Sequence, residues 1–171
     1  ARPNPAAVGE DESMVRNVEA NIAMLEMLGD RPLSVIERKQ PGVVPLQVLR
    51  GQAYMKLTVM GLKNQRFVFD TGATSVTVSP RLAARAKLTP IKPFTIAGTG
   101  ARRTETGDLV LLEEVAVGEG ILLRNVPATI REPAGPEEGL VGPALFYVFD
   151  ITVDLKRRTL SFETPAGSRP A

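Results

Sequence analysis

From about Leu46 onward, short apolar runs alternate with polar and glycine-containing segments. They fall into three pairs, namely 53–60 with 66–70, 109–117 with 121–130, and 149–154 with 159–162. Two short strand-like runs joined by a brief polar segment are typical of a β-hairpin. The pattern therefore predicts an all-β, mainly β-stranded fold with short helices.

The segments between these pairs predict shorter elements. We expect a strand at 76–78, a short helix at 81–86 behind Pro80, and a strand at 94–97. The tip of the next hairpin is expected at Gly98, Thr99, Gly100, Ala101, Arg102 and Arg103. A last short helix is expected within 139–146. No internal repeat occurs, which argues against a protein built from two duplicated lobes.

The N-terminal segment has a different, helical periodicity. Residues 11–28 predict one amphipathic helix, capped by Asp11 or Ser13 and followed by Gly29, whereas residues 1–10 are expected to be disordered. The apolar stripe consists of Val15, Val18, Ile22, Leu25 and Leu28, and it is widened by Met14, Met24 and Met27. Either this helix packs on its own domain, or it is a propeptide-like arm that docks on a partner or on the chain itself.

These patterns divide the chain into three parts. We expect an N-terminal arm at 1–45, one folded domain at 46–163 and a flexible tail at 164–171. The longest apolar stretches are too short to span a bilayer. The small, alanine-containing start of the chain is compatible with a removed export signal, so we expect an extracytoplasmic, periplasmic or secreted, bacterial protein.

Composition excludes several kinds of chemistry. The chain has no Cys and no His, which excludes thiol catalysis, disulfides, thiolate or imidazole metal sites and a Ser-His-Asp triad. Its 21 basic and 19 acidic residues show no basic stripe with interleaved aromatics, so no nucleic-acid partner is expected. Acid–base catalysis by this chain would therefore use carboxylates.

One carboxylate stands out by its position. The apolar run Phe67-Val68-Phe69 leads directly into Asp70, Thr71 and Gly72. An ionised carboxylate at the tip of a buried strand is costly unless it is paired or functional. The alternative is an ordinary turn with Asp and Gly chosen for backbone reasons. Asp150 and Asp154, in the last hairpin, are expected to be surface or turn carboxylates.

Peptide hydrolysis by carboxylates needs two of them around one water. One removes a proton from the water, and the other, protonated, donates to the substrate carbonyl. Because two carboxylates a few ångströms apart cannot both ionise, such a pair shares one proton. The chain contains Asp-Thr-Gly once, which supplies half of a pair. The economical solution is a two-fold homodimer in which the same surface meets itself.

Residues from about Leu46 to Phe162 resemble a retropepsin-like aspartic protease, the retroviral type that also occurs as single-domain bacterial enzymes. The matching segments are Phe67–Thr74, the Gly98–Thr104 hairpin and Gly139–Gly142. The resemblance implies that Asp70 is catalytic, that Thr71, Gly72, Ala73 and Thr74 support it, and that residues 98–103 form a flap over the substrate. It also implies that Leu140, Val141 and Gly142 pack under the active-site loop.

The resemblance further implies a closed, barrel-like fold, a homodimer, and endopeptidase activity on a peptide or protein substrate without metal or cofactor. Water would be activated by two Asp70 carboxylates, one from each subunit. Two alternatives stay open. In the first alternative to an active protease, the domain is a catalytically idle module that binds peptides or dimerises. In the second, it is a protease held inactive by its N-terminal arm.

Overall fold

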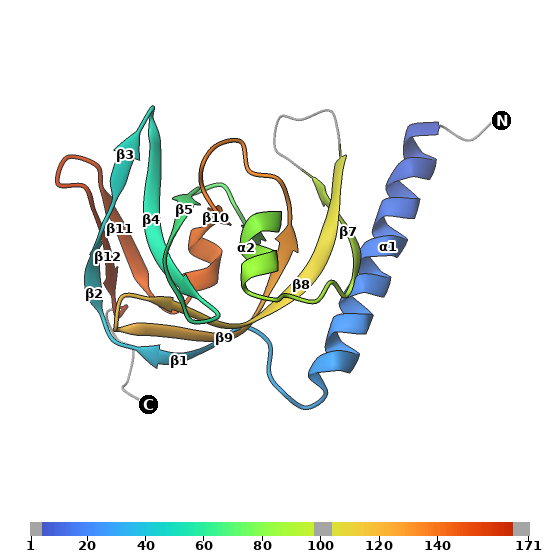
Figure 1. The fold of residues 1–171 in the computed structure, drawn as a ribbon, viewed down its shortest axis with the longest axis horizontal. Coiled ribbons are helices and arrows are strands. Elements are labelled where there is room, and N and C mark those ends of the chain that lie inside the picture. Colours follow the sequence, from blue (N-terminus) through green and yellow to red (C-terminus); the bar gives the residue numbers. More distant parts are fainter. Residues whose placement is uncertain (1–4, 98–103, 166–171) are drawn as a thin grey trace.

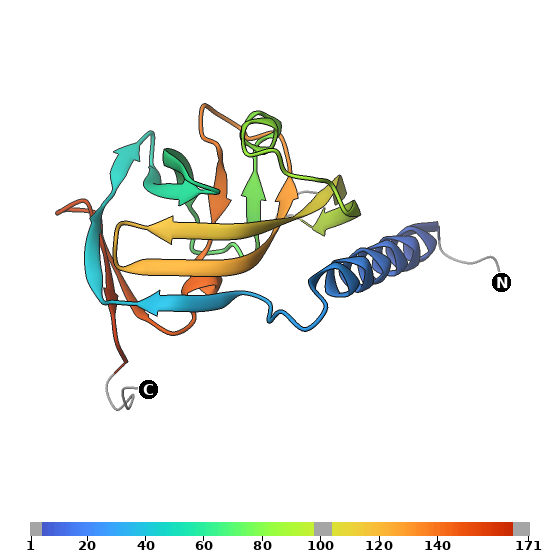
Figure 2. The same ribbon diagram turned by 60° about the horizontal axis from the view of Figure 1, so that its bottom comes forward.

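The computed structural model describes residues 5–97 and 104–165 of the 171-residue chain. Figures 1 and 2 show a strand-rich body with one long helix, α1 (Pro5–Leu28), at one end. The prediction of a mainly β fold with an N-terminal helix is confirmed. Among the described helices, none combines the length and the apolar character that crossing a membrane requires.

Most strands belong to one sheet that closes into a ring. Around the ring, the strands are β4 (Gln52–Val59), β5 (Leu62–Phe69), β10 (Gly139–Val141), β6 (Val76–Val78), β9 (Ile121–Ile130) and β8 (Thr104–Val117). Each strand hydrogen-bonds to the next, and β8 pairs again with β4. The β5–β10 and β6–β9 pairings are parallel, and the others are antiparallel.

Three further strands extend the ring at its edges. They are β1 (Val35–Lys39) beside β9, β3 (Gln47–Leu49) beside β4, and β7 (Lys92–Ala97) beside β8. A separate small sheet has the order β11 (Asp150–Asp154), β12 (Thr159–Glu163) and β2 (Gly42–Pro45). In Figure 1 it lies at the opposite end of the body from α1. Two strands of the predicted N-terminal arm, β1 and β2, therefore belong to the two sheets, although the division of the chain at residue 45 stays a prediction.

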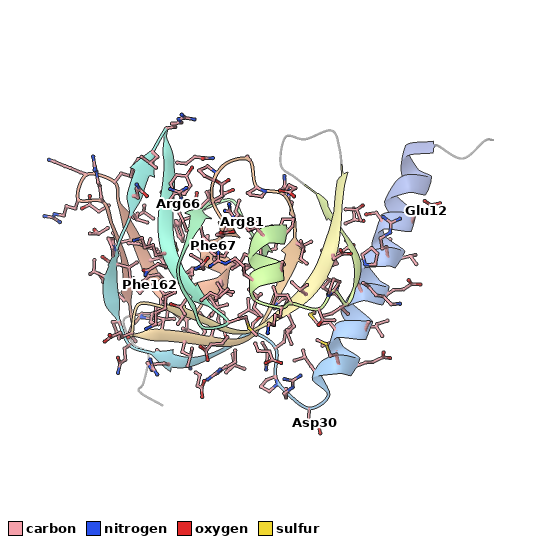
Figure 3. The ribbon with its side chains drawn as sticks, viewed as in Figure 1. Glu12, Asp30, Arg66, Phe67, Arg81 and Phe162 are labelled. Carbon is pink, nitrogen blue, oxygen red and sulfur yellow. The ribbon has the colours of Figure 1, made fainter. Side chains whose placement is uncertain are left out.

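One hydrophobic core fills the ring and continues under the small sheet. In the first half of β9, buried Ile121 and Leu123 alternate with partly exposed residues, as expected for a strand with one face turned inward. Between the closed sheet and the small sheet, the aromatic side chain of Phe162 packs edge-on against Phe146 and Phe149. Its centroid lies 5.0 Å from that of Phe146 and 5.7 Å from that of Phe149. Figure 3 shows Phe162 in this region and Phe67 in the interior of the body.

The structure corrects two expectations about the N-terminal helix. It begins at Pro5 rather than at Asp11 or Ser13, because proline suits the first helical turn and the alanines behind it favour helix. The predicted stripe was also wrong about the buried face. Ala20, Met24 and Leu28 pack on the body, whereas the other four stripe residues are exposed.

The segment 139–146 is not one helix. Gly139–Val141 is strand β10, and only Pro143–Phe146 forms a short 3₁₀ helix, η1. Because β5 and β6 both leave hydrogen-bonding groups open toward this segment, β10 is held between them as an extended strand. The other short helix is α2 (Pro80–Arg85), which begins and ends one residue earlier than the expected 81–86 and has Ser79 as its N-cap.

Candidate active site

The backbone around Asp70 is tightly held while its side chain faces solvent. Strand β5 ends in buried Phe67, Val68 and Phe69, and the next residue, Asp70, is exposed. The Asp70 amide donates to the Val141 carbonyl at 3.0 Å, and the Asp70 carbonyl accepts from the Ala73 amide at 3.1 Å. The Gly72 amide donates to Asp70 Oδ1 at 2.9 Å, which closes an Asx-type turn. Backbone amides of the loop therefore restrain the position of the Asp70 carboxylate.

Strand β10 lies directly beneath this loop, parallel to β5 and antiparallel to β6. Its fit depends on the absence of a side chain at Gly142. A Cβ there would lie 1.9 Å from the Ala73 carbonyl oxygen, far inside van der Waals contact. The structure thus brings Val141 and Gly142 against the 70–73 loop, and Leu140 against the groove described next.

Asp70 and Thr71 form part of the wall of an open groove of about 580 Å³. Strands β3, β4, β5, β10 and β11 and the segment between β9 and β10 supply most of the rest of the wall. Apolar walls come from Val48, Ala53, Val68, Phe69, Leu140, Val153 and Leu155, and polar groups come from Gln52, Arg131, Glu132 and Glu137. A concave, mostly apolar groove with a few polar groups is the usual form of a ligand site.

The remaining predicted residues lie as follows. Thr71, Gly72 and Thr74 are exposed and Ala73 is partly buried, so the face of the loop that turns away from β10 is open. Beside it, Thr74 and Tyr147 line a smaller hollow of about 180 Å³, and Tyr147 is 67% exposed. The predicted flap residues, Gly98 to Arg103, lie outside the described residues. The two strands that lead into and out of that segment, β7 and β8, are paired.

Other acidic groups of the described chain do not pair with Asp70. Among the described residues, the one hydrogen bond to its carboxylate comes from the Gly72 amide. Glu137, in the groove wall, is buried and accepts from the Gly135 amide at 3.0 Å. Asp150 is exposed on β11, and Asp154 on the same strand forms an ion pair with Arg157. Within residues 5–97 and 104–165, no group of three or more acidic side chains could hold a metal ion.

An ion-pair network around the buried Glu138, next to the site, was not predicted from the sequence. Glu138, immediately before β10, accepts from Ser79 Oγ at 2.6 Å and from Arg81 Nε at 3.1 Å, and its Oε1 lies 3.3 Å from Arg85. Arg81, labelled in Figure 3, and Arg85 both come from α2. Ser79 also caps α2 by accepting from the Leu82 amide. The network joins α2 to the start of β10.

The charges of this network change the ionisation of Glu138. Burial by itself raises the pKa of its carboxyl, but hydrogen bonds from Ser79 and Arg81 and the charges of Arg81 and Arg85 outweigh burial. The pKa therefore lies below its ordinary value of 4.5. A lowered pKa in the folded state stabilises the fold above the ordinary pKa, and that contribution is lost as the pH falls through the lowered value.

We expect Glu138→Gln to lower the free energy of unfolding at pH 7 by about 1–3 kcal/mol, because the two arginines and Ser79 lose a charged acceptor. The difference between the variant and the wild type should shrink as the pH falls from about 4.5, where the unfolded chain begins to bind the proton, through the lowered pKa of the folded Glu138 carboxyl. Denaturant unfolding at several pH values measures this. Glu163→Gln, at an exposed position, is the matched control, and an equal effect at both positions would contradict the assigned role of the network.

Comparisons with known proteins agree with this architecture. A family model described as aspartyl protease matches residues 55–144. A retropepsin-like aspartic protease from Rickettsia conorii is 18% identical, with a TM-score of 0.53, and the match covers 75% of this chain and 94% of that one. The retroviral protease-like domain of Ddi1 from Leishmania major is 13% identical, with a TM-score of 0.43 and coverages of 69% and 95%. No curated protein matches the chain. The expected retropepsin-like fold is confirmed.

Proposed function

Because the chain belongs to the aspartyl protease family, we propose that it is an aspartic endopeptidase whose active site forms between two copies. Each copy contributes one Asp70. The observation that carries this proposal is the state of Asp70 in the single chain. It is exposed in the wall of a groove, its backbone is fixed, and no carboxyl group of the described residues bonds to it. A second carboxylate has to come from elsewhere, and a two-fold dimer brings it at the same position.

The reaction then follows from two carboxylates that share one proton. The ionised Asp70 removes a proton from water as the water oxygen attacks the peptide carbonyl carbon. The protonated Asp70 of the other copy donates its proton to the carbonyl oxygen, which gives a neutral tetrahedral intermediate. When the carbon–nitrogen bond breaks, the carboxyl group that took the proton from water gives it to the leaving amine nitrogen. The other carboxylate takes a proton from one hydroxyl of the intermediate, whose oxygen becomes the carbonyl oxygen of the new carboxylic acid. The two groups end with one proton between them, as they began.

The fixed loop supports this chemistry. Acid–base catalysis requires its groups within hydrogen-bond reach of the reacting atoms, with little freedom to move away. The bonds from Asp70 to Val141 and from Gly72 to Asp70 restrict the loop before any substrate binds. The exposed Thr71 and Thr74 leave this surface open to a second copy.

The groove indicates the kind of substrate. An extended peptide binds to a sheet-lined groove with its main chain along the strands and alternate side chains in pockets. The walls beside Asp70 include Val48, Leu140, Val153 and Leu155, which favour aliphatic side chains near the cleaved bond. A flexible, unstructured polypeptide is therefore the expected substrate class.

We expect the peptidase activity per mole of chain to rise with protein concentration and to level off once the dimer is complete, because a monomer holds half of the site. Cleavage of a quenched fluorescent peptide with aliphatic residues at the bond, followed over a wide range of enzyme concentration, measures this. Sedimentation under the same conditions gives the monomer fraction. Constant activity per mole where the chain is monomeric would contradict a shared site.

The two alternatives, an idle binding module and a protease held inactive by its arm, predict different observations. An idle binding module would bind the same peptides without cleaving them. A protease held inactive by its arm would need α1 in the groove, but none of the described residues that line the groove comes from α1. No specific observation favours either alternative over catalysis.

A further inference from the structure

Glu138 is bonded to two flanking segments through its backbone, one residue before β10 begins. Its amide donates to the carbonyl of Arg66, on β5, at 2.7 Å. Its carbonyl accepts from the amide of Ser79, directly after β6, at 2.7 Å. Glu138 thus extends the pairing of β10 with both neighbouring strands. The position of this residue therefore sets the position of the first end of β10.

The carboxylate of Glu138 ties the same residue to α2. Arg81 and Arg85 lie 3.0 and 3.3 Å from its Oε1, and the Ser79 hydroxyl donates to its Oε2 at 2.6 Å. The Glu138 side chain is 10% exposed, whereas those of Arg81 and Arg85 are 64% and 46% exposed. Charge-assisted hydrogen bonds hold a group more firmly than neutral ones, and salt screens a carboxylate this little exposed only weakly. The carboxylate therefore fixes the start of β10 relative to α2.

The other end of β10 holds the Asp70 loop. The Val141 carbonyl accepts from the Asp70 amide at 3.0 Å. Three extended residues, 139–141, lead from Glu138 to this bond, and they span about 10 Å. Because a strand is already close to the full reach of its chain, it cannot stretch to absorb a shift. A displacement of Glu138 along the strand is therefore passed on to Val141.

Strand β10 has little room to absorb a shift sideways. A Cβ at Gly139 would lie 2.0 Å from the Thr77 carbonyl oxygen, and one at Gly142 would lie 1.9 Å from a carbonyl oxygen of the 70–73 loop. Both ends of the strand are therefore in close backbone contact with their neighbours. Protein interiors packed in this way are hard to compress and transmit a displacement. The network around Glu138 is thus mechanically connected to the catalytic loop.

We propose that Glu138 is a positioning residue for catalysis, whose ion pairs with Arg81 and Arg85 set the place of β10 and thereby that of the Asp70 carboxylate. Glu138 is not among the described residues that line the groove, so it acts through Asp70 and not on the substrate. The inference rests on the proposed function. Because each Asp70 of the shared site is held by its own network, an error in placement enters the site twice. Misplacing a catalytic group by about 1 Å can cost about a hundredfold in rate.

The first test neutralises the carboxylate. We expect Glu138→Gln to lower kcat for peptide cleavage at least about tenfold and to change KM less than about threefold, because Asp70 is displaced while the groove stays intact. Steady-state kinetics with the fluorescent peptide measure this. They are run well below the unfolding temperature and at concentrations where the dimer is complete.

Ile36→Ala is the matched control for stability. Ile36 is a buried residue of β1 outside the groove walls, so its truncation destabilises the fold at least as much as Glu138→Gln does. Its kcat should stay within about twofold of the wild type. A loss of kcat that follows stability alone, equal in the two variants, would overturn the positioning role.

The second test asks whether Glu138 acts through the two arginines. Replacing Arg81 and Arg85 together by glutamine should lower kcat by a factor similar to that of Glu138→Gln. Because the three residues form one network, adding Glu138→Gln to this double variant should lower kcat by less than about a further twofold. A further tenfold loss would overturn the assignment of the effect to these ion pairs.

The third test follows the loop without any substrate. The bond to the Val141 carbonyl protects the Asp70 amide from hydrogen exchange. Glu138→Gln should speed the exchange of this amide at least about tenfold more than Ile36→Ala does, because it loosens β10 locally. Amide exchange followed by NMR measures both variants.

The outcomes separate this inference from the proposed function. A Glu138→Gln variant that keeps the wild-type kcat, and whose Asp70 amide exchanges no faster than in Ile36→Ala, overturns the positioning role and leaves the shared active site standing. A lowered kcat without faster exchange overturns the connection through β10, and a raised KM at constant kcat overturns the inference by placing the effect in the groove. Faster exchange in a chain whose wild type cleaves no peptide supports the positioning of the loop and contradicts the proposed function.

Discussion

Replacing Asp70 by asparagine should lower kcat/KM for peptide cleavage by about a thousandfold or more, because the change removes both the general base and the general acid from the shared site. The fold should be unaffected. Asp70 is exposed, and its side chain makes one hydrogen bond, which the asparagine oxygen can also accept from Gly72. Steady-state kinetics with a fluorescent peptide and a thermal unfolding curve of the same preparation measure both effects.

Asp150→Asn is the matched control. It makes the same chemical change at another exposed carboxylate, on β11 and outside the groove walls. Its activity should stay within about twofold of the wild type. An equal loss at Asp150 would indicate a second catalytic acid within one chain, and undiminished cleavage by purified Asp70→Asn protein would exclude Asp70 from catalysis.

Replacing Gly142 by alanine should destabilise the protein by about 3 kcal/mol or more and remove most of the activity. The added Cβ would meet the Ala73 carbonyl oxygen at 1.9 Å, so either β10 or the 70–73 loop has to move. Because the Val141 carbonyl holds the Asp70 amide, movement of either one shifts the catalytic carboxylate. Denaturant unfolding and the same peptide assay measure the two effects.

Gly42→Ala separates this close approach from the general effect of adding a methyl group. Gly42 lies in β2, and a Cβ there meets no atom within 4 Å. The change should alter stability by less than about 1 kcal/mol, partly by restricting the unfolded chain. Equal stabilities of Gly142→Ala and Gly42→Ala would show that β10 does not support the loop in the way described.

The strands were predictable from sequence because their signals are local. Period-two burial and turn residues lie within each hairpin, as at Met60 and Gly61, where φ values of 49° and 77° form a turn that suits the twist of two strands. Strand β6 was predicted with the bounds that the structure has. The position of Asp70 at the end of β5 followed from the same local pattern.

The errors have a different origin, since they depend on contacts between distant segments. The spacing of apolar residues could not show which face of α1 is buried. That face is fixed by hydrogen bonds between the Asn17 side chain and the backbone of Thr95, which lies 78 residues away in the sequence. The sequence of β10 resembles the start of a helix, and its extended conformation depends on pairing with β5 and β6, which come from earlier parts of the chain. Glu138 gave no signal, because its arginine partners lie more than fifty residues away.

The measurement that tests the central claim most directly mixes wild-type chain with the Asp70→Asn variant under conditions where subunits exchange. If each site needs Asp70 from both copies, random pairing makes activity per wild-type chain proportional to the wild-type fraction. It should therefore fall to about one half in an equal mixture and to about one tenth with a ninefold excess of the variant. Activity per wild-type chain that stays constant in these mixtures would contradict a site shared between two subunits.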